Sequence, residues 1–188
     1  ALVRQYLKEQ GVAEEALADM VNRLLMSTAT PIVDEAHDTL YFVRRQGAGL
    51  ANPAAAVASQ AYIQVEGTNK SKFELGDDPE RTGVYTMDFE VVNFSDGEKT
   101  YTLDTTVLGQ KAEGGQIRGG KVTYLVYDYA RKLSAAVTSS TADGKITVPA
   151  HATAQVSVTV TLSDADRAYM DERFPYGAYV EGFVQLMS

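Results

Sequence analysis

The sequence predicts a mainly β chain, in which a short α-helical segment precedes an antiparallel β-sandwich. Apolar residues recur at helical spacing only in the first third of the chain; after Ala58 they alternate with polar residues at a spacing of two. The 188 residues suffice for one domain or slightly more, and hydrophobic residues make up 45% of them. We therefore divide the chain into a helical part, residues 1–57, and a sandwich, residues 58–188.

The helical part is expected to hold two helices, followed by a short strand and a third, short helix. The first helix, residues 1–10, ends at Gly11, a residue suited to a helix C-terminus. It begins without a capping side chain, so we expect that the chain starts inside a longer helix. The second helix, residues 13–28, carries one apolar stripe, made of Ala13, Ala16, Leu17, Met20, Val21, Leu24 and Leu25.

A short strand near residues 40–43 and a helix over residues 54–57, capped by Asn52, complete the helical part. In the sandwich, six or seven strands are expected. Four runs alternate: Tyr85 to Val91, Tyr101 to Val107, Val122 to Val126, and Ala154 to Leu162. Residues 93–97 have the composition of a hairpin turn, and residues 149–152 form another turn. Ser163 is expected to cap a helix that ends near Arg173, and residues 178–187 form a last strand.

Composition excludes several classes of function. The chain has no cysteine, which excludes disulfides, thiolate zinc sites and cysteine nucleophiles. A net charge of −8 argues against nucleic-acid binding. No apolar run reaches the length of a membrane-spanning helix, and no signal peptide is recognised. The absence of cysteine slightly favours an extracellular location.

A histidine-dependent triad would have to use one of only two histidines, His37 and His151. His37 lies in a polar loop between Asp34 and Asp38, which could orient its ring. The sequence offers no nucleophile elbow to go with it, so we interpret His37 as a solvated loop residue. His151 follows Pro149 in a turn, and we interpret it in the same way.

Other polar motifs also favour structural explanations. Residues 44–50 lack the ending of a phosphate-binding loop, so we expect Gly47 and Gly49 to allow close packing against the helices, with Arg44 and Arg45 as surface or interface cations. The acidic clusters at residues 76–80 and 164–172 lack calcium-loop spacing. Two triplets match the glycosylation pattern, beginning at Asn69 and Asn93.

Tyrosines are concentrated late in the chain, where they could either anchor loops or line a binding surface. They are Tyr124, Tyr127, Tyr129, Tyr169, Tyr176 and Tyr179. We favour the anchoring role. We predict no catalytic, cofactor-binding or metal-binding residue in the chain.

A resemblance to a known family is carried by segments in both parts. Residues 1–8, 24–31 and 44–52 resemble the end of a subtilisin-like serine protease domain, and residues 73–76, 91–96, 146–150, 156–163 and 175–184 resemble the fibronectin-III-like domain that follows it. The group is that of the cell-envelope proteinases of Gram-positive bacteria. The resemblance implies that residues 1–57 are the C-terminal helices and strand of a protease domain, and that residues 58–188 are a fibronectin-III-like sandwich, with one more strand beyond Ser188.

The resemblance further implies a secreted, cell-surface or wall-associated parent that hydrolyses peptide bonds with an Asp/His/Ser triad upstream of this chain. This segment would then be non-catalytic, its sandwich docked on the protease domain. Its expected partners are the remainder of that domain and the protein or peptide substrates of the parent. The alternative is a stand-alone Ig-like module that binds protein or glycan. Burial of the second helix's stripe within the chain would favour this alternative, and exposure would indicate a missing partner domain.

Overall fold

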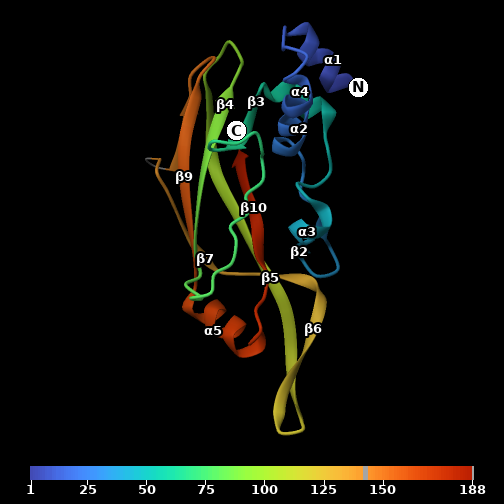
Figure 1. Cartoon of the computed structure of the whole chain (residues 1–188), viewed down its shortest axis with the longest axis vertical. Coiled ribbons are helices and arrows are strands. Elements are labelled where there is room, and N and C mark those ends of the chain that lie inside the picture. Colours follow the sequence, from blue (N-terminus) through green and yellow to red (C-terminus); the bar gives the residue numbers. More distant parts are fainter. Residues whose placement is uncertain (142–143, 188) are drawn as a thin grey trace.

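The chain is mainly β and forms antiparallel sheets (Figure 1), as predicted. The computed structural model describes residues 1–141 and 144–187. One sheet has the order β3 (Ala61–Val65), β4 (Val84–Asn93), β9 (Thr153–Leu162) and β7 (Ala135–Ser139). The other has the order β10 (Val180–Met187), β5 (Lys99–Arg118) and β6 (Lys121–Lys132), and β8 (Lys145–Val148) also pairs with β5. The described residues thus hold eight sandwich strands, against the six or seven expected.

The core lies between the two sheets and follows the alternation read from the sequence. In β4, Phe89 is buried directly opposite Val156 of β9. The second sheet contributes Ile146 and Val148, both buried in β8. Residues between these positions face outward, as expected of strands that have one buried and one exposed face.

Helix α5 (Asp164–Arg173) crosses the end of the sandwich, and it begins where the sequence predicted. The Ser163 side chain caps it by accepting a hydrogen bond from the Asp166 backbone N–H at 3.1 Å. The buried Asp166 carboxylate accepts hydrogen bonds from Arg131 and from the Ser134 backbone, both at 2.6 Å. Asp166, in the first turn of α5, therefore links the helix to β6 and to the segment that follows it.

The helical part runs along one side of the sandwich (Figure 1). Its elements are α1 (Leu2–Glu9), α2 (Leu17–Ser27), β1 (Val33–Asp34), β2 (Thr39–Leu40), α3 (Val43–Gln46) and α4 (Pro53–Ser59). Asn52 caps α4 by accepting from the Ala55 N–H at 3.0 Å, as expected. No helix in the described part of the chain is long and apolar enough to span a membrane.

Two predictions about the helical part are wrong in detail. The second helix begins at Leu17 rather than at Ala13, because residues 14–16 form a turn and Ala16 provides no capping side chain. The strand expected over residues 40–43 ends at Leu40, and Val43 already belongs to α3. Phe42, between the two, turns its ring into the protein and is 2% exposed. Burial of this ring overrides the strand propensity of its neighbours.

The hairpin expected at residues 93–97 is also wrong, because β4 and β5 belong to different sheets. The segment crosses from one sheet to the other. Asn93 is 1% exposed, and its side-chain amide donates to the carbonyls of Gly97, Val148 and Pro149 at 2.8, 3.1 and 3.0 Å. These bonds join two crossover segments, so Asn93 pins the two sheets together.

The alternation in β6 predicted a buried face, but much of this strand is exposed. Val122 is 57% exposed and Val126 is 47% exposed. Strands β5 and β6 continue past the sandwich as a two-stranded hairpin that extends beyond α5 (Figure 1). Helix α5 contacts this extension at Ala112 and Tyr124 but leaves Val122 and Val126 exposed, so alternation there does not produce burial.

Candidate functional site

The contacts between the helical part and the sandwich are the best candidate for a functional site. They form two regions, which we call the helix seat and the Phe42 seat. The helix seat comprises α1, α2 and α4 where they pack on β3 and Phe94. The Phe42 seat comprises β2 and α3 where they pack on β5, β6 and β10. Together they bind almost the whole helical part to one side of the sandwich.

The helix seat is mainly apolar. Its buried residues are Val3, Leu7, Leu17, Leu24 and Ala56, and Tyr62 and Phe94 of the sandwich part pack against them. Burial raises the pKa of the Tyr62 hydroxyl. Leu17 and Leu24 are completely buried, whereas Leu2 at the start of α1 is exposed. Two residues of the predicted stripe, Leu17 and Leu24, are thus buried within this chain. Ala16, Met20, Val21 and Leu25 are half-buried, and Ala13 is exposed.

Polar bonds fix the direction in which α2 lies on β3. The Ser27 hydroxyl accepts from the Ile63 N–H at 2.9 Å. Arg23 donates to the Gln64 side chain at 2.5 Å, and Gln64 in turn donates to Glu90 of β4. These bonds hold the last turns of α2 in register with the edge strand of the sheet.

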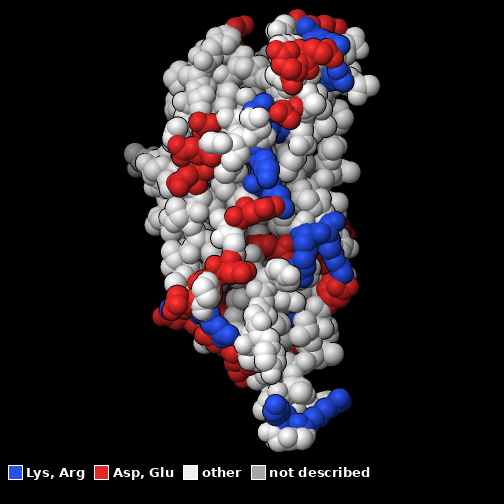
Figure 2. Space-filling model, in the orientation of Figure 1, with Lys and Arg blue, Asp and Glu red and all other residues white. Residues whose placement is uncertain are grey.

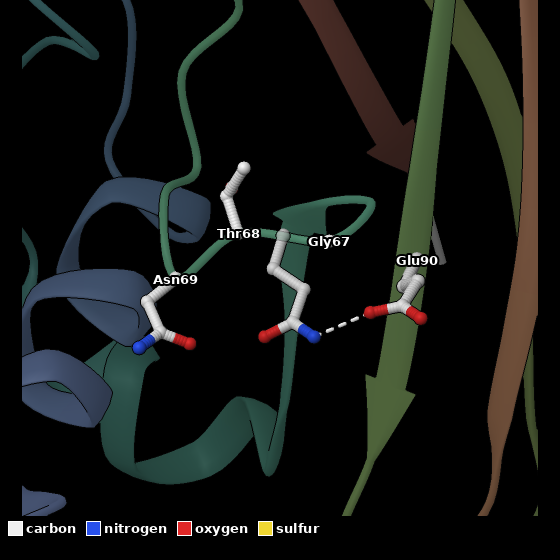
Figure 3. A pocket seen from close by; sticks show the side chains of 5 residues that line it. Gly67, Thr68, Asn69 and Glu90 are labelled. Atoms are coloured by element: carbon white, nitrogen blue, oxygen red, sulfur yellow. Dashed lines mark hydrogen bonds between the residues drawn. The ribbon is translucent and has the colours of Figure 1, made fainter.

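A shallow hollow beside this contact is lined by Gln64, Gly67, Thr68, Asn69 and Glu90. Gln64 donates a hydrogen bond to Glu90, which the dashed line in Figure 3 marks. Asn69 begins one of the two glycosylation triplets, and its side chain donates to Asp19 of α2 at 3.3 Å. The other triplet begins at Asn93, whose buried side-chain amide donates to backbone carbonyls, including that of Val148, that link the two sheets. Of the two asparagines, only Asn69 is accessible.

The Phe42 seat has one aromatic anchor. The ring of Phe42 lies in a cluster with Leu108 of β5 and Ala130 of β6, both buried, and with Leu40 and Phe183 at its margin. The guanidinium of Arg44 stacks 3.7 Å from the centre of the Phe42 ring. The anchor is therefore covered by a cation on its exposed side.

Two ion pairs flank the anchor. Glu181 of β10 accepts from the Arg44 backbone N–H at 2.9 Å and also pairs with its guanidinium. Arg45 pairs with Asp128 of β6, and this hydrogen bond lowers the pKa of the Asp128 carboxyl. The two arginines are thus interface cations, as the sequence suggested, and each contacts a different strand.

Gly47 and Gly49 serve different purposes in the loop after α3. A Cβ at Gly49 would overlap the Thr30 carbonyl, in the segment that follows α2, so the expected close approach occurs there. Gly47 has φ +64° and open space around it. Its role is to supply a left-handed turn rather than close packing.

The structure brings His37 and Asp34 together: Nδ1 of His37 lies 2.9 Å from Asp34 Oδ2. The Asp34 side chain is 9% exposed, and the His37 ring stacks on Tyr129 of β6 with centroids 3.7 Å apart. Asp38, the other candidate, is exposed. Among the hydrogen bonds of residues 1–141 and 144–187, none joins a hydroxyl to His37. The Asp34 carboxylate orients the His37 ring against Tyr129 of β6. The Asp34–His37 pair therefore adds a contact to the Phe42 seat.

His151 lies in the exposed turn after β8, where its Nε2 is 2.9 Å from Asp96. This contact joins the two crossover segments near Asn93. The structure describes no nucleophile hydrogen-bonded to this histidine either. The side-chain hydrogen bonds described for the two histidines thus go to carboxylates, Asp34 and Asp96.

The acidic clusters serve as caps and ion pairs. Asp78 accepts from the backbone N–H groups of Gly83 at 2.9 Å and Thr82 at 3.0 Å, and these bonds lower the pKa of its carboxyl. In α5, Asp164 pairs with Arg167, and Asp171 pairs with Arg81. Within the described ranges, no group of three or more acidic or histidine side chains is placed to hold a metal ion.

The late tyrosines divide into anchors and exposed residues. The Tyr169 hydroxyl bonds to the backbone of Gln110 and Ala112 in β5, and Tyr124 donates to Glu172. Tyr176 and Tyr179 are exposed, at 98% and 67%. Sequence reasoning named these tyrosines but missed Phe42, Asp128 and Glu181. No local pattern identifies those three, because their partners lie far away in the chain.

The sequence of this chain is similar to a protein family and to several known proteins. Residues 73–188 match the Fn3-like domain family. The C5a peptidase of Streptococcus pyogenes serotype M18 is 27% identical over 169 residues, which are 89% of this chain and 13% of the peptidase. The C5a peptidase of serotype M1 is 25% identical over 167 residues, with the same coverage. The chain thus spans 13% of the length of these relatives. Since the family match covers more than half of the residues, the chain belongs to the Fn3-like domain family.

Proposed function

We propose that this chain is a non-catalytic part of a secreted, cell-surface serine endopeptidase of the subtilisin type, and that its sandwich supports the end of the peptidase domain. Homology to the C5a peptidases over 89% of the chain supports the assignment to such a parent. The resemblance of residues 1–57 to the end of a peptidase domain supports the division of labour. In this assignment, the sandwich holds the helical part, which is the end of the peptidase domain, in place.

The Phe42 seat is the observation that carries this proposal. Phe42 belongs to the segment that resembles the peptidase domain, and its ring is buried between β5 and β6 of the sandwich. Arg44 and Arg45 add ion pairs to two different strands. A supporting module must hold its neighbour by contacts that resist rotation, and an anchor flanked by two ion pairs has that property.

The parent's substrates are proteins or peptides under this proposal, and the remainder of the peptidase domain is the main partner. The location is extracellular, at the surface or wall of a Gram-positive bacterium. The acidic surface, with a net charge of −8, fits these partners better than it fits nucleic acid.

The non-catalytic assignment is tested by incubating the 188-residue chain with a fluorogenic casein substrate. We expect no turnover above buffer. Turnover that a serine-directed inhibitor abolishes would overturn the assignment.

The supporting role is tested in the complete peptidase with Phe42→Ala, with Val137→Ala in the exposed part of β7 as the matched control. We expect Phe42→Ala to lower the melting temperature of the peptidase domain, and the control to leave it unchanged. Equal melting temperatures for both variants and the unmodified peptidase would contradict the supporting role.

A second candidate, a stand-alone binding module, is favoured by one observation: Leu17 and Leu24 are completely buried within this chain. A helical segment that buries the two central leucines of its stripe within the chain can form a self-contained unit. The exposed Tyr176 and Tyr179 would then be candidate contacts for protein or glycan. Binding to a glycan array that is lost in a Tyr176→Ala, Tyr179→Ala double variant would support this candidate; unchanged binding would exclude those residues.

A further inference from the structure

The outer part of the β5–β6 hairpin, residues 112–126, projects from the sandwich, and we call it the arm. Beyond Gln110, β5 pairs only with β6 among the described residues, whereas closer to the core it also pairs with β8 and β10. Gly119 and Gly120 form the tip, both with positive φ, as the tight turn of a two-residue hairpin requires. From Ala112 to the tip and back to Val126, neither strand of this ribbon pairs with a third strand among the described residues.

The arm exposes apolar side chains that the proposed function does not use. Ile117 is 78% exposed and lies directly opposite Val122, which is 57% exposed. Val126, 47% exposed, lies on the same face of β6, and Leu125, 62% exposed, lies on the other. Isolated exposed aliphatic residues are common, but here they gather on one narrow ribbon. Such a ribbon is expected to be stable only when another surface covers it.

The charge of the arm differs from that of the rest of the chain. The arm, residues 112–126, includes two basic residues, Arg118 and Lys121, and one acidic residue, Glu113, which pairs with Lys111, although the whole chain has a net charge of −8. Arg118 and Lys121 are cross-strand neighbours at the tip. In the view of Figure 2, basic side chains lie at the end of the molecule where Figure 1 places the tip of β5 and β6, with no acidic side chain beside them on this face. The tip of the arm is therefore basic and favours an anionic partner.

We propose that the arm is a docking site for an extended, acidic polypeptide segment, which pairs with the free edge of β6 over residues 121–126 and covers its aliphatic side chains. The edge of β6 is favoured over that of β5. The Tyr169 hydroxyl and the Arg173 guanidinium already bond the β5 backbone at Ala112, and a bulge at Gly114 and Gly115 interrupts the strand. The proposal concerns the arm alone and does not depend on the proposed function.

A polypeptide is the favoured occupant because the unpaired edges need hydrogen-bond partners. A strand that adds to an edge supplies N–H and C=O groups along its whole length. A lipid bilayer supplies none in its apolar region, so inserting a ribbon with open edges is costly. Acidic side chains on the added strand would pair with Arg118 and Lys121.

The test uses the 188-residue chain and a synthetic ten-residue peptide of alternating valine and glutamate, blocked at both ends. Amide NMR spectra are recorded during titration with this peptide and with a matched valine–lysine peptide. We expect the glutamate peptide to shift and protect amides of residues 121–126, and the lysine peptide to bind at least tenfold more weakly. Equal binding of both peptides, or shifts elsewhere, would overturn the proposal.

Two variants locate the effect. Arg118→Glu together with Lys121→Glu should weaken binding of the glutamate peptide at least tenfold. The control, Lys70→Glu together with Lys145→Glu, makes the same charge change on exposed lysines outside the arm and should leave binding unchanged. Circular dichroism checks that both double variants are folded. If the Arg118→Glu, Lys121→Glu variant is not folded, Arg118→Gln together with Lys121→Gln replaces it and should give an intermediate loss of binding.

Two other occupants are outcomes that would overturn the proposal. Vesicles with anionic headgroups that bind the chain through Arg118 and Lys121, without peptide binding, would make the arm a membrane contact. Sedimentation could also show a monomer–dimer equilibrium that the Arg118→Glu, Lys121→Glu variant abolishes. Without peptide binding, this result would mean that a second copy of the chain occupies the arm.

Discussion

The helix seat and the Phe42 seat attach the same segment to the same sandwich by different means. The helix seat buries five apolar residues from three helices, whereas the Phe42 seat buries one aromatic ring from the helical part and surrounds it with ion pairs. Apolar burial depends little on salt, and exposed ion pairs are screened by it. The comparison indicates that the two seats can be loosened separately.

The largest effect is expected from Phe42→Ala. Removing a buried aromatic ring costs about 4 kcal/mol of unfolding free energy, from lost burial and from the cavity left behind. Hydrogen exchange should show opening of β2 and α3, while α2 stays protected. Tyr41→Ala, at the neighbouring exposed position, is the control and should cost less than about 1 kcal/mol. Equal opening of both seats would show that they form one cooperative unit.

Leu24→Ala makes the corresponding change in the helix seat. Leu24 is completely buried, and its truncation should cost about 3 kcal/mol in denaturant unfolding. The loss should be smaller than that of Phe42→Ala because fewer atoms are removed and because four other buried residues remain. Leu2→Ala, at an exposed position in α1, should change stability by less than about 0.5 kcal/mol. A larger loss for Leu24→Ala than for Phe42→Ala would reverse the ranking of the seats.

Glu181→Gln removes a charge from the Phe42 seat while keeping an acceptor for the Arg44 N–H. We expect a loss of about 1 kcal/mol, since Arg44 is partly exposed and the pair is screened. The loss should shrink when ionic strength is raised from about 0.1 M to about 1 M, which shortens the screening length from about 10 Å to about 3 Å. Glu98→Gln, an exposed control, should show no such dependence. A loss that does not change with salt would mean that Glu181 acts through hydrogen bonding alone.

The sequence predicted the elements whose partners are local or periodic. The alternation of Val156, Val158 and Val160 identified the buried face of β9, and Ser163 identified the start of α5. Both signals depend on a repeat or a cap that acts within a few residues. The fold class followed from such signals.

What the sequence missed depends on distant partners. Residues 93–97 have hairpin composition, yet the Asn93 side chain bonds carbonyls near residue 149 and redirects the chain to the other sheet. The alternation of β6 is the same whether or not a second layer covers the strand, so it could not indicate that Val122 is exposed. Phe42 has no periodic neighbours, and its burial depends on Leu108 and Ala130. These outcomes follow from tertiary packing, which overrides local preference.

The smallest expected effect concerns the pH dependence of the Phe42 seat. The hydrogen bond from Arg45 lowers the pKa of Asp128 in the folded chain. A carboxyl whose pKa is lower in the folded than in the unfolded state stabilises the fold at pH values above its unfolded pKa, and this contribution is lost as the pH falls through the folded pKa. The contact of Arg45 with Asp128 should therefore weaken in acid while the apolar helix seat persists. NMR titration of the Asp128 carboxyl should give a higher midpoint in Arg45→Gln than in the unmodified chain, and Arg118→Gln, a charge change in the arm, should leave it unchanged. An unchanged midpoint in Arg45→Gln would show that the pKa of Asp128 does not depend on this contact.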